Sequence, residues 1–263
     1  MSPTPAPRSP LGQPALQEAA GSQWVVTLLP STPSTNAVAV QQPAPGSVVV
    51  ADHQTAGRGR LDRSWQTPPG TALTFSAVVD PGLPDARWPL VPLAAGLAVA
   101  EAVRRCGVDA VLKWPNDVLV EGAADGAEGK LAGILVERTG QPPRAVIGIG
   151  INVDLDADEL PVPTATSLSL AGARVDRTML LGLVLAALAE HVDALRVDPV
   201  ALVAAYRERC ATLTREVEVQ LPGGRALRGT AVDVDVDGRL VVIVDGERVP
   251  VGAGDVLHVR PAG

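Results

Sequence analysis

The chain has 263 residues, of which 46% are hydrophobic and only 2% aromatic, and its 22 basic and 29 acidic side chains give a formal net charge of −7. The 26 glycines and 24 prolines stay below the share that signals low-complexity disorder, so most of the chain is expected to fold. The acidic balance argues against a general affinity for nucleic acid, and the apolar runs at residues 90–100 and 180–189 are shorter than the roughly 20 residues that span a bilayer. We therefore expect neither a nucleic acid nor a membrane as a partner.

Two rare residue types carry further information. Cys106 and Cys210 lie far apart and match no metal or redox motif, which is typical of reduced thiols in a cytoplasmic protein, and no signal peptide is visible. Among the 22 basic residues only Lys113 and Lys130 are lysines. In a chain that otherwise uses arginine, both positions are candidates for a specific role.

The first 107 residues contain a predicted tail, three strands and two helices. Residues 1–22 hold five prolines among small and polar residues, and we expect a disordered tail there. Strands are predicted at 24–29, 48–52 and 72–79, and Thr35 or Asn36 is a candidate cap for a short helix through residue 41. Residues 53–70 show no apolar periodicity, whereas residues 88–106 have a helical period that ends at Gly107.

The rest of the chain predicts a sheet with covering helices, and then a change of character. Strands are expected at 111–114, 118–120, 131–137 and 144–153, with a hairpin-like turn at 122–129, a long loop at 154–167 and helices at 177–195 and 199–210. After residue 212, short strands alternate with turn signals such as Asp245-Gly246. The fold class predicted is α/β (α+β): a mixed-sheet catalytic domain with packed helices at 23–211, followed by a small SH3-like β-barrel domain at 212–263.

Several familiar motifs fail on inspection. Gly57-Arg58-Gly59 and Gly148-Ile149-Gly150 both lack the third glycine of a dinucleotide fingerprint. The aspartates at 233, 235 and 237 resemble the start of an EF-hand loop, but Val244 stands where a bidentate glutamate is needed. The three histidines have no zinc spacing, and no Gly-x-Ser-x-Gly elbow supplies a serine nucleophile.

Three segments remain that combine charge, glycine and amide groups. Residues 57–65 place Arg58, Arg60 and Arg63 in six positions, together with two glycines and Trp65. Glycines allow close backbone approach to a ligand, arginines bind carboxylate or phosphate, and a tryptophan can stack on a purine. Taken alone, this segment could be a solvated basic loop.

The other two segments carry the two lysines. Residues 113–117 combine Lys113 with Asn116 and Asp117 at a break between strands, and residues 129–137 start a buried strand with Lys130 and leave space at Gly133. Taken alone, Lys130 could be a strand-edge charge and Lys113 an ion-pair partner. A further buried strand includes residues 148–153 and carries the amide Asn152 near its end.

In this order the motifs resemble those of the biotin–protein ligases. The resemblance rests on Ser34-Thr35-Asn36, Gln54-Thr55-Ala56-Gly57-Arg58-Gly59-Arg60 with Arg63 and Trp65, Lys113-Trp114-Pro115-Asn116-Asp117, the strands at 129–137 and 148–153, and Ala165-Thr166-Ser167-Leu168. It covers about residues 24–211, and the β-rich remainder fits the small C-terminal domain of that family. Asp62 departs from the glycine that many members have, which adds a negative charge and restricts the loop backbone.

The resemblance implies a two-step reaction: activation of biotin by ATP as biotinyl-5′-AMP, then transfer to a lysine of a biotin carboxyl carrier domain of biotin-dependent carboxylases such as acetyl-CoA carboxylase. ATP with Mg²⁺ would be required, and no tightly bound prosthetic group. The catalytic residues implied are Lys130, Arg60 and Asp117.

The same resemblance implies the binding residues. Biotin would be held by Ser34, Thr35, Gln54, Gly57, Arg58, Arg60, Lys130 and Gly133. ATP would be bound by Arg63, Trp65, Lys113, Asn116, Asp117 and Asn152. Mg²⁺ would sit on the ATP phosphates, with Asp117 as a further candidate ligand.

Three other interpretations are considered. A lipoate or octanoate ligase or transferase would share the scaffold, although the Gly-Arg-Gly-Arg loop favours biotin. A biotin-responsive repressor needs a DNA-binding domain of about 50 residues, and only some 22 residues precede the first strand. A non-catalytic binding module would leave the upstream motifs without a purpose. The identity of the carrier, the oligomeric state and the role of the C-terminal domain stay open.

Overall fold

The structure is a computed structural model that describes residues 8–41, 43–61, 63–123, 127–221, 223–252 and 254–258. Asp62, whose effect on the loop was raised above, the first seven residues of the predicted tail and the middle of the turn predicted at 122–129 lie outside these residues.

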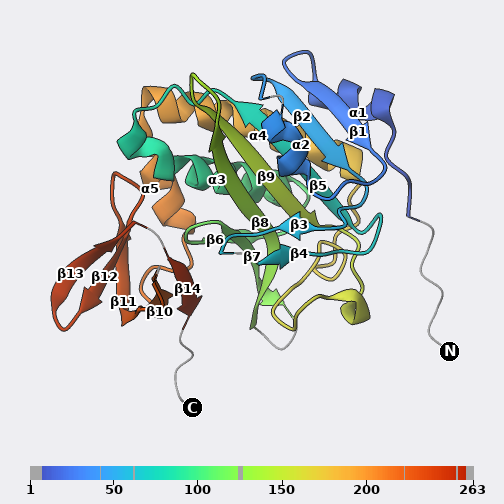
Figure 1. Cartoon of the computed structure of the whole chain (residues 1–263). Coiled ribbons are helices and arrows are strands. Elements are labelled where there is room, and N and C mark those ends of the chain that lie inside the picture. The colour runs from blue at the N-terminus through green and yellow to red at the C-terminus, as the bar shows by residue number, and fades with distance from the viewer. Residues whose placement is uncertain are drawn as a thin grey trace.

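A seven-stranded mixed sheet forms the centre of the fold, with the strand order β1-β2-β5-β9-β8-β7-β6 (Figure 1). Its first pair is parallel and the remaining pairs are antiparallel. The strands are β1 (Val25–Leu29), β2 (Ser47–Ala51), β5 (Ala72–Val79), β6 (Ala110–Lys113), β7 (Asp117–Ala123), β8 (Ala127–Thr139) and β9 (Arg144–Asn152). The predicted strands are thus confirmed, but β7 and β8 extend into the segment expected to be a turn.

The two faces of this sheet differ because side chains alternate along each strand. Val48 and Val50 pack into the main core together with apolar residues of α3 (Val91–Arg105) and α4 (Arg177–Val197). Val49, between them, faces the opposite side, where it packs with Ala39 of α2 (Thr35–Gln41). Helices α3 and α4 therefore cover one face, and the short helix α2 covers only part of the other.

The remaining helical elements extend these layers. They are α1 (Gln13–Ala20), the 3-10 turns η1 (Asp85–Leu90) and η3 (Ala157–Glu159), and α5 (Pro199–Arg209). The expected helices are confirmed, but the short one begins at Thr35, so its cap position is Ser34 rather than Thr35 or Asn36. Segments Asp85–Arg105 and Arg177–Val197 are, by length and composition, apolar enough to cross a membrane, which corrects our estimate from the apolar runs. Both contribute to the core against the sheet, as core helices of similar composition do.

Helix α1 contradicts the prediction of a disordered tail through residue 22. Its Leu16 is fully buried in the main core, and Ala20 is also buried. The prolines misled the prediction because Pro14 stands in the first turn, where a helix needs no backbone N–H from it.

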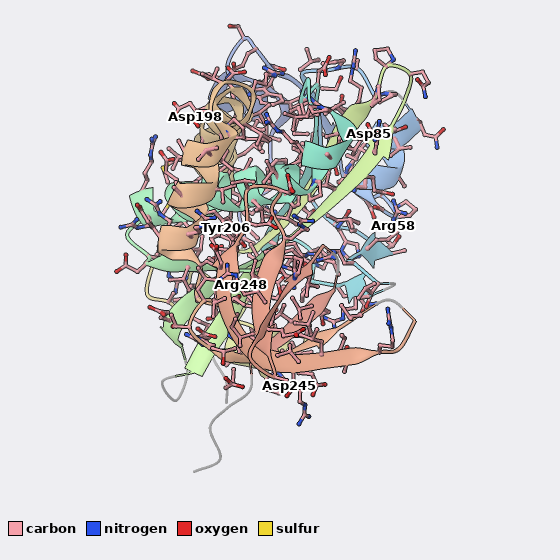
Figure 2. All side chains as sticks on the ribbon, turned by 90° about the vertical axis from the view of Figure 1, so that its left-hand side faces the viewer. Arg58, Asp85, Asp198, Tyr206, Asp245 and Arg248 are labelled. Atoms are coloured by element: carbon pink, nitrogen blue, oxygen red, sulfur yellow. The ribbon has the colours of Figure 1, made fainter. Side chains whose placement is uncertain are left out.

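The predicted C-terminal β domain is confirmed as a five-stranded antiparallel sheet with the order β13-β12-β11-β10-β14. Its strands are β10 (Glu216–Gln220), β11 (Ala226–Val234), β12 (Leu240–Val244), β13 (Glu247–Val251) and β14 (Asp255–His258). The Asp245-Gly246 turn has positive φ at both residues and lies at the end of this sheet away from the helices (Figure 2).

Candidate functional site

The site lies on the sheet face that α3 and α4 leave free. Three positions on this face are glycines, Gly133 of β8 and Gly148 and Gly150 of β9, and each has a neighbour close to where a side chain would stand. A Cβ at Gly150 would lie 2.5 Å from Cε2 of Trp65, and one at Gly148 would lie 2.2 Å from Oδ1 of Asn36. The glycines thus let Trp65 and Asn36 rest directly on the strands.

A short hairpin within residues 53–70 holds Trp65 there. Strands β3 (Gly57–Arg58) and β4 (Ser64–Trp65) pair antiparallel, and the hairpin lies across the central strands (Figure 1). Residues 53–70, which show no apolar periodicity, thus contain a defined hairpin. The Trp65 ring packs on Gly133 and Gly150, which we call the glycine floor, rather than into an apolar core.

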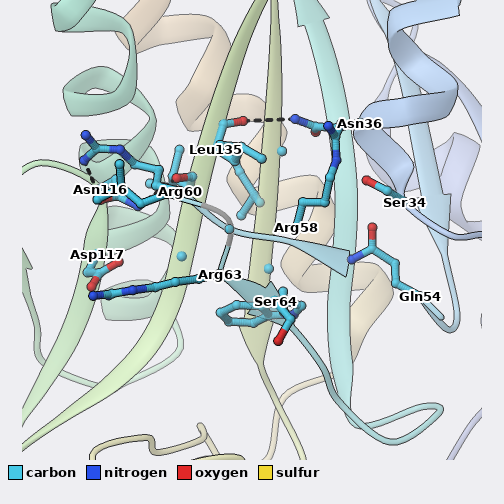
Figure 3. Close-up of a pocket in the computed structure, with 18 of the residues that line it drawn as sticks. Ser34, Asn36, Gln54, Arg58, Arg60, Arg63, Ser64, Asn116, Asp117 and Leu135 are labelled. Atoms are coloured by element: carbon cyan, nitrogen blue, oxygen red, sulfur yellow. Dashed lines mark hydrogen bonds between the residues drawn. The ribbon is translucent and has the colours of Figure 1, made fainter. Parts of the chain in front are cut away.

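Two clefts meet at this hairpin. The first, of about 110 Å³, holds most of the predicted site residues (Figure 3): Ser34, Thr35, Gln54, Arg58, Arg60, Arg63, Trp65, Asn116, Asp117, Lys130 and Gly133. The second, of about 1390 Å³, opens towards the C-terminal sheet and adds Lys113 and Asn152. Trp65, Asp117 and Lys130 border both clefts. Gly57 lines neither, and its Cα approaches the Trp65 backbone instead.

One end of the first cleft is polar and uncharged. Gln54 accepts a hydrogen bond through Oε1 from the backbone N–H of Thr35 at 2.8 Å, and the Thr35 hydroxyl oxygen lies 3.1 Å from the same Oε1. Ser34 and Thr35 are 4% and 3% exposed, so these groups are almost withdrawn from water. Such an end suits a ligand that offers N–H and C=O groups at once.

The other end carries the charges. Lys130 Nζ lies 2.7 Å from Asp117 Oδ1, and Arg60 donates to Asn116 Oδ1 at 3.1 Å (Figure 3). Burial lowers the pKa of Arg60 below its usual value, although Asp255 and Asp117 act in the opposite direction. Arg60 and Lys130 thus place two cations in the same cleft, with Asp117 and Asp255 as the nearby carboxylates.

The three arginines of the predicted basic cluster separate from one another. Arg58 pairs with Glu137 at 2.8 Å on β8, and Arg63 pairs with Asp255 on β14. Of these three arginines, only Arg60 forms no ion pair with a carboxylate of the described residues. The arginines therefore tie the hairpin to two different elements in addition to lining the cleft.

Lys113 and Asn152 support the second cleft in different ways. Burial lowers the pKa of Lys113, opposed chiefly by Asp117 and Asp255. Asn152 is 2% exposed and donates to the Thr166 carbonyl at 2.8 Å, which holds the loop after β9 beside Lys130. Its Oδ1 is buried and has no hydrogen-bond donor within the described ranges, so Asn152 keeps an unused acceptor at the edge of the cleft.

Three residues of the site were missed by the sequence analysis. Asn36 and Glu137 stand inside motifs that had been noticed, but nothing in a one-dimensional pattern says that their side chains meet. Asp255 lies about 190 positions after the hairpin, and no sequence signal connects the two.

Comparisons with known proteins show two family matches and one relative along nearly the full chain. Residues 28–154 match the Biotin/lipoate A/B protein ligase family, and residues 212–259 match the Biotin protein ligase C terminal domain. The chain is 38% identical to Biotin–[acetyl-CoA-carboxylase] ligase of Mycobacterium tuberculosis over 96% of this chain and 97% of that protein.

Solved structures share the fold. Biotin protein ligase from Aquifex aeolicus in complex with biotin and ATP superimposes with a TM-score of 0.77 at 26% identity, covering 89% of this chain and 98% of that one. The ligase from Leishmania major in complex with biotinyl-5-AMP gives 0.58 at 25% identity, over 87% and 98% of the two chains. With a relative 38% identical along nearly its full length and this shared architecture, the chain belongs to the biotin protein ligase family.

Proposed function

We propose that the chain joins biotin to a lysine of a biotin carboxyl carrier domain in two steps. A carboxylate oxygen of biotin attacks the α-phosphorus of ATP, and pyrophosphate leaves. The amine of the carrier lysine then attacks the acyl carbon of biotinyl-5′-AMP, loses a proton, and AMP leaves. No covalent bond to the protein is needed in either step.

The polarity of the first cleft carries this proposal. The uncharged polar end, with Ser34, Thr35 and Gln54, suits the ureido ring of biotin. Arg60 and Lys130 line the same cleft, beside the glycine floor on which Trp65 packs. The first step brings two anions together, so two cations in a partly buried place can stabilise the charge that develops. An apolar dithiolane or alkyl chain would leave the buried polar groups unpaired, which favours biotin over lipoate or octanoate.

The individual roles follow from position. We assign the biotin carboxylate and α-phosphate to Arg60 and Lys130, with the backbone of Arg58 over biotin and Gly133 leaving room beneath it. The role of Gly57, which lines neither cleft, rests on the resemblance alone. ATP is assigned to Arg63, Trp65, Lys113, Asn116, Asp117 and Asn152. All but Asn116 border both clefts or line the second, and Asn116 lines the first beside Asp117. Asp117 is the proposed acceptor for the proton of the carrier amine.

Mg²⁺ fits this arrangement chiefly through the nucleotide. The described residues contain no group of three or more histidine, cysteine, aspartate or glutamate residues able to hold a metal, so most of its ligands would be phosphate oxygens. Asp117 is the carboxylate best placed to add a protein ligand. The ion would neutralise negative charge on the phosphates.

The proposal includes the division of the chain at residues 211 and 212, which the start of the second family match supports. It also includes a cytoplasmic location, in line with the free thiols Cys106 and Cys210. The absence of nucleic acid and membrane partners stays a prediction.

The deciding assay incubates the chain with labelled biotin, ATP and Mg²⁺, with and without a carrier domain. Pyrophosphate release without carrier and a labelled lysine with carrier are the expected results. Lipoate and octanoate serve as competing substrates, and labelling by either of them in preference to biotin would overturn the assignment of the substrate.

A further inference from the structure

A buried series of hydrogen-bonding groups runs from the polar end of the first cleft to strand β8. Thr35 Oγ1 lies 2.7 Å from Ser76 Oγ, and Ser76 Oγ lies 2.6 Å from Asn36 Oδ1. Asn36 in turn donates from Nδ2 to Glu137 Oε2 at 2.7 Å and to the Leu135 carbonyl at 3.3 Å (Figure 3). Glu137 also accepts from Arg58 at 2.8 Å.

The orientation of the Asn36 amide is determined by its neighbours. Glu137 Oε2 and the Leu135 carbonyl can only accept hydrogen bonds, so the NH₂ group must face them. The amide oxygen then faces Ser76. The hydrogen bond to the Glu137 carboxylate is the shorter of the two, and its acceptor is charged. Charge-assisted hydrogen bonds of this kind are roughly twice as strong as neutral ones.

This orientation fixes the hydroxyl protons in turn. Ser76 is fully buried and has one proton for two contacts. Because the Asn36 oxygen cannot donate, it takes that proton, and the short contact with Thr35 is satisfied when Thr35 donates to Ser76. The single Thr35 proton then serves this 2.7 Å contact rather than the longer 3.1 Å contact with Gln54 Oε1, an oxygen that already accepts the Thr35 backbone N–H. Thr35 then directs lone pairs, rather than a proton, into the cleft.

We propose that Glu137 is a positioning residue for biotin: through Asn36 and Ser76 it makes the Thr35 hydroxyl an acceptor for a ureido N–H. This inference rests on the proposed function, because the ligand group is that of biotin. It adds a residue outside the first cleft's lining to the determinants of specificity. Glu137 then has two separate roles: it accepts a hydrogen bond from Asn36, which orients the series, and it forms an ion pair with Arg58.

Three variants test this inference by calorimetric titration with biotin. Glu137→Leu removes the shorter, charged acceptor of the Asn36 amide and should raise the Kd for biotin about tenfold or more, since only the Leu135 carbonyl at 3.3 Å then holds the amide in its orientation. Ser76→Ala breaks the series without touching Arg58 and should have a similar effect. Glu137→Gln keeps an acceptor oxygen for Asn36 and should stay within about threefold of the wild type.

Kinetics and a matched control separate positioning from general damage. In the biotinylation assay, Glu137→Leu and Ser76→Ala should raise KM for biotin while KM for ATP stays within about twofold, a split that loss of stability would not produce. Asp85→Asn removes the ion pair with Arg138, the next residue on β8, and should leave both KM values unchanged. Urea unfolding checks that each variant folds.

The outcomes decide the question. Wild-type affinity in Glu137→Leu or Ser76→Ala overturns the inference, and so does equal weakening in Glu137→Gln and Glu137→Leu, which would assign the effect to the ion pair with Arg58. Should Glu137→Leu not fold, Ser76→Ala and Glu137→Gln decide alone. No binding of biotin by the wild-type protein would overturn the proposed function, and this inference with it.

Discussion

Lys130 and Asp117 form an ion pair between the neighbouring strands β7 and β8, although they are not paired in the strand register. Asp117 pairs with Gly133 and Lys130 with Leu119, and the register shifts between Val118 and Leu119. The Lys130 backbone is also fixed from the other side, because its N–H donates to the Thr164 carbonyl and its carbonyl accepts from the Thr166 N–H. The backbone of Lys130 is therefore held between β7 and the loop at 164–166, while its ammonium group pairs with Asp117.

Replacing Lys130 by alanine should lower the rate of pyrophosphate release about 10²- to 10³-fold, because it removes a cation placed where negative charge develops. The rate is measured in the absence of carrier, with saturating biotin and ATP. Arg104→Ala, which removes a surface ion pair with Asp109 far from the clefts, is the control for loss of a positive charge. Release at the wild-type rate in Lys130→Ala would contradict the assigned role.

Asp117→Asn should slow the transfer from preformed biotinyl-5′-AMP to the carrier, about 10²-fold, because an amide cannot accept the proton of the incoming amine. Single-turnover transfer is the measurement. If the variant slows adenylate formation and leaves transfer intact, Asp117 acts only on ATP or its metal, and the assignment as proton acceptor is wrong.

At the scale of elements, the exposed edge of the central sheet is closed by two side chains of α1. Gln13 donates to the Val26 carbonyl and accepts from the Leu28 N–H, both at 2.7 Å. Gln17, one helical turn later, donates to the Trp24 carbonyl at 2.8 Å and accepts from the Val26 N–H at 2.9 Å. The two amides thus imitate a neighbouring strand, which protects an edge that would otherwise be free to pair with another chain.

The double variant Gln13→Ala/Gln17→Ala should expose that edge. We expect the amides of Val26 and Leu28 to exchange with solvent about tenfold faster, because each loses its acceptor. We also expect concentration-dependent association in sedimentation experiments. Glu18→Gln, an exposed change on the same helix, should alter neither property, and unchanged exchange in the double variant would refute the role of the glutamines.

At the scale of the whole molecule, the C-terminal sheet supports the central one from behind the loop that carries Asn116 and Asp117. Trp114, only 2% exposed, donates from its indole N–H to the Gly238 carbonyl at 2.9 Å, and its backbone N–H donates to Thr212 Oγ1 at 3.1 Å. Gly238 needs its positive φ of 80°, and a Cβ there would lie 2.9 Å from Leu90. The turn between β11 and β12 therefore packs closely against Leu90, at the end of η1.

Trp114→Phe should lower the free energy of unfolding by about 1–3 kcal/mol, because the buried Gly238 carbonyl loses its donor. A rise in KM for ATP should accompany this, since the loop with Asp117 loses its support. Trp24→Phe is a matched control: the Trp24 indole N–H is buried and has no acceptor among the described residues, so its removal breaks no bond. Equal unfolding free energies for Trp114→Phe and the wild type, measured in urea, would contradict the supporting role.

The sequence by itself determined the layered α/β fold, the separate β domain and the family, because apolar periodicity and turn chemistry are local and because the ligase motifs occur in order. It also named most residues of the first cleft. Only the tertiary structure decided that the proline-rich start of the chain forms a helix, since that helix is stabilised by burial of Leu16 and by the backbone of β1 rather than by local propensity. Likewise, only folding decided which carboxylate each arginine meets and that Glu137 reaches Asn36, because such pairings join positions about 80 to 190 residues apart.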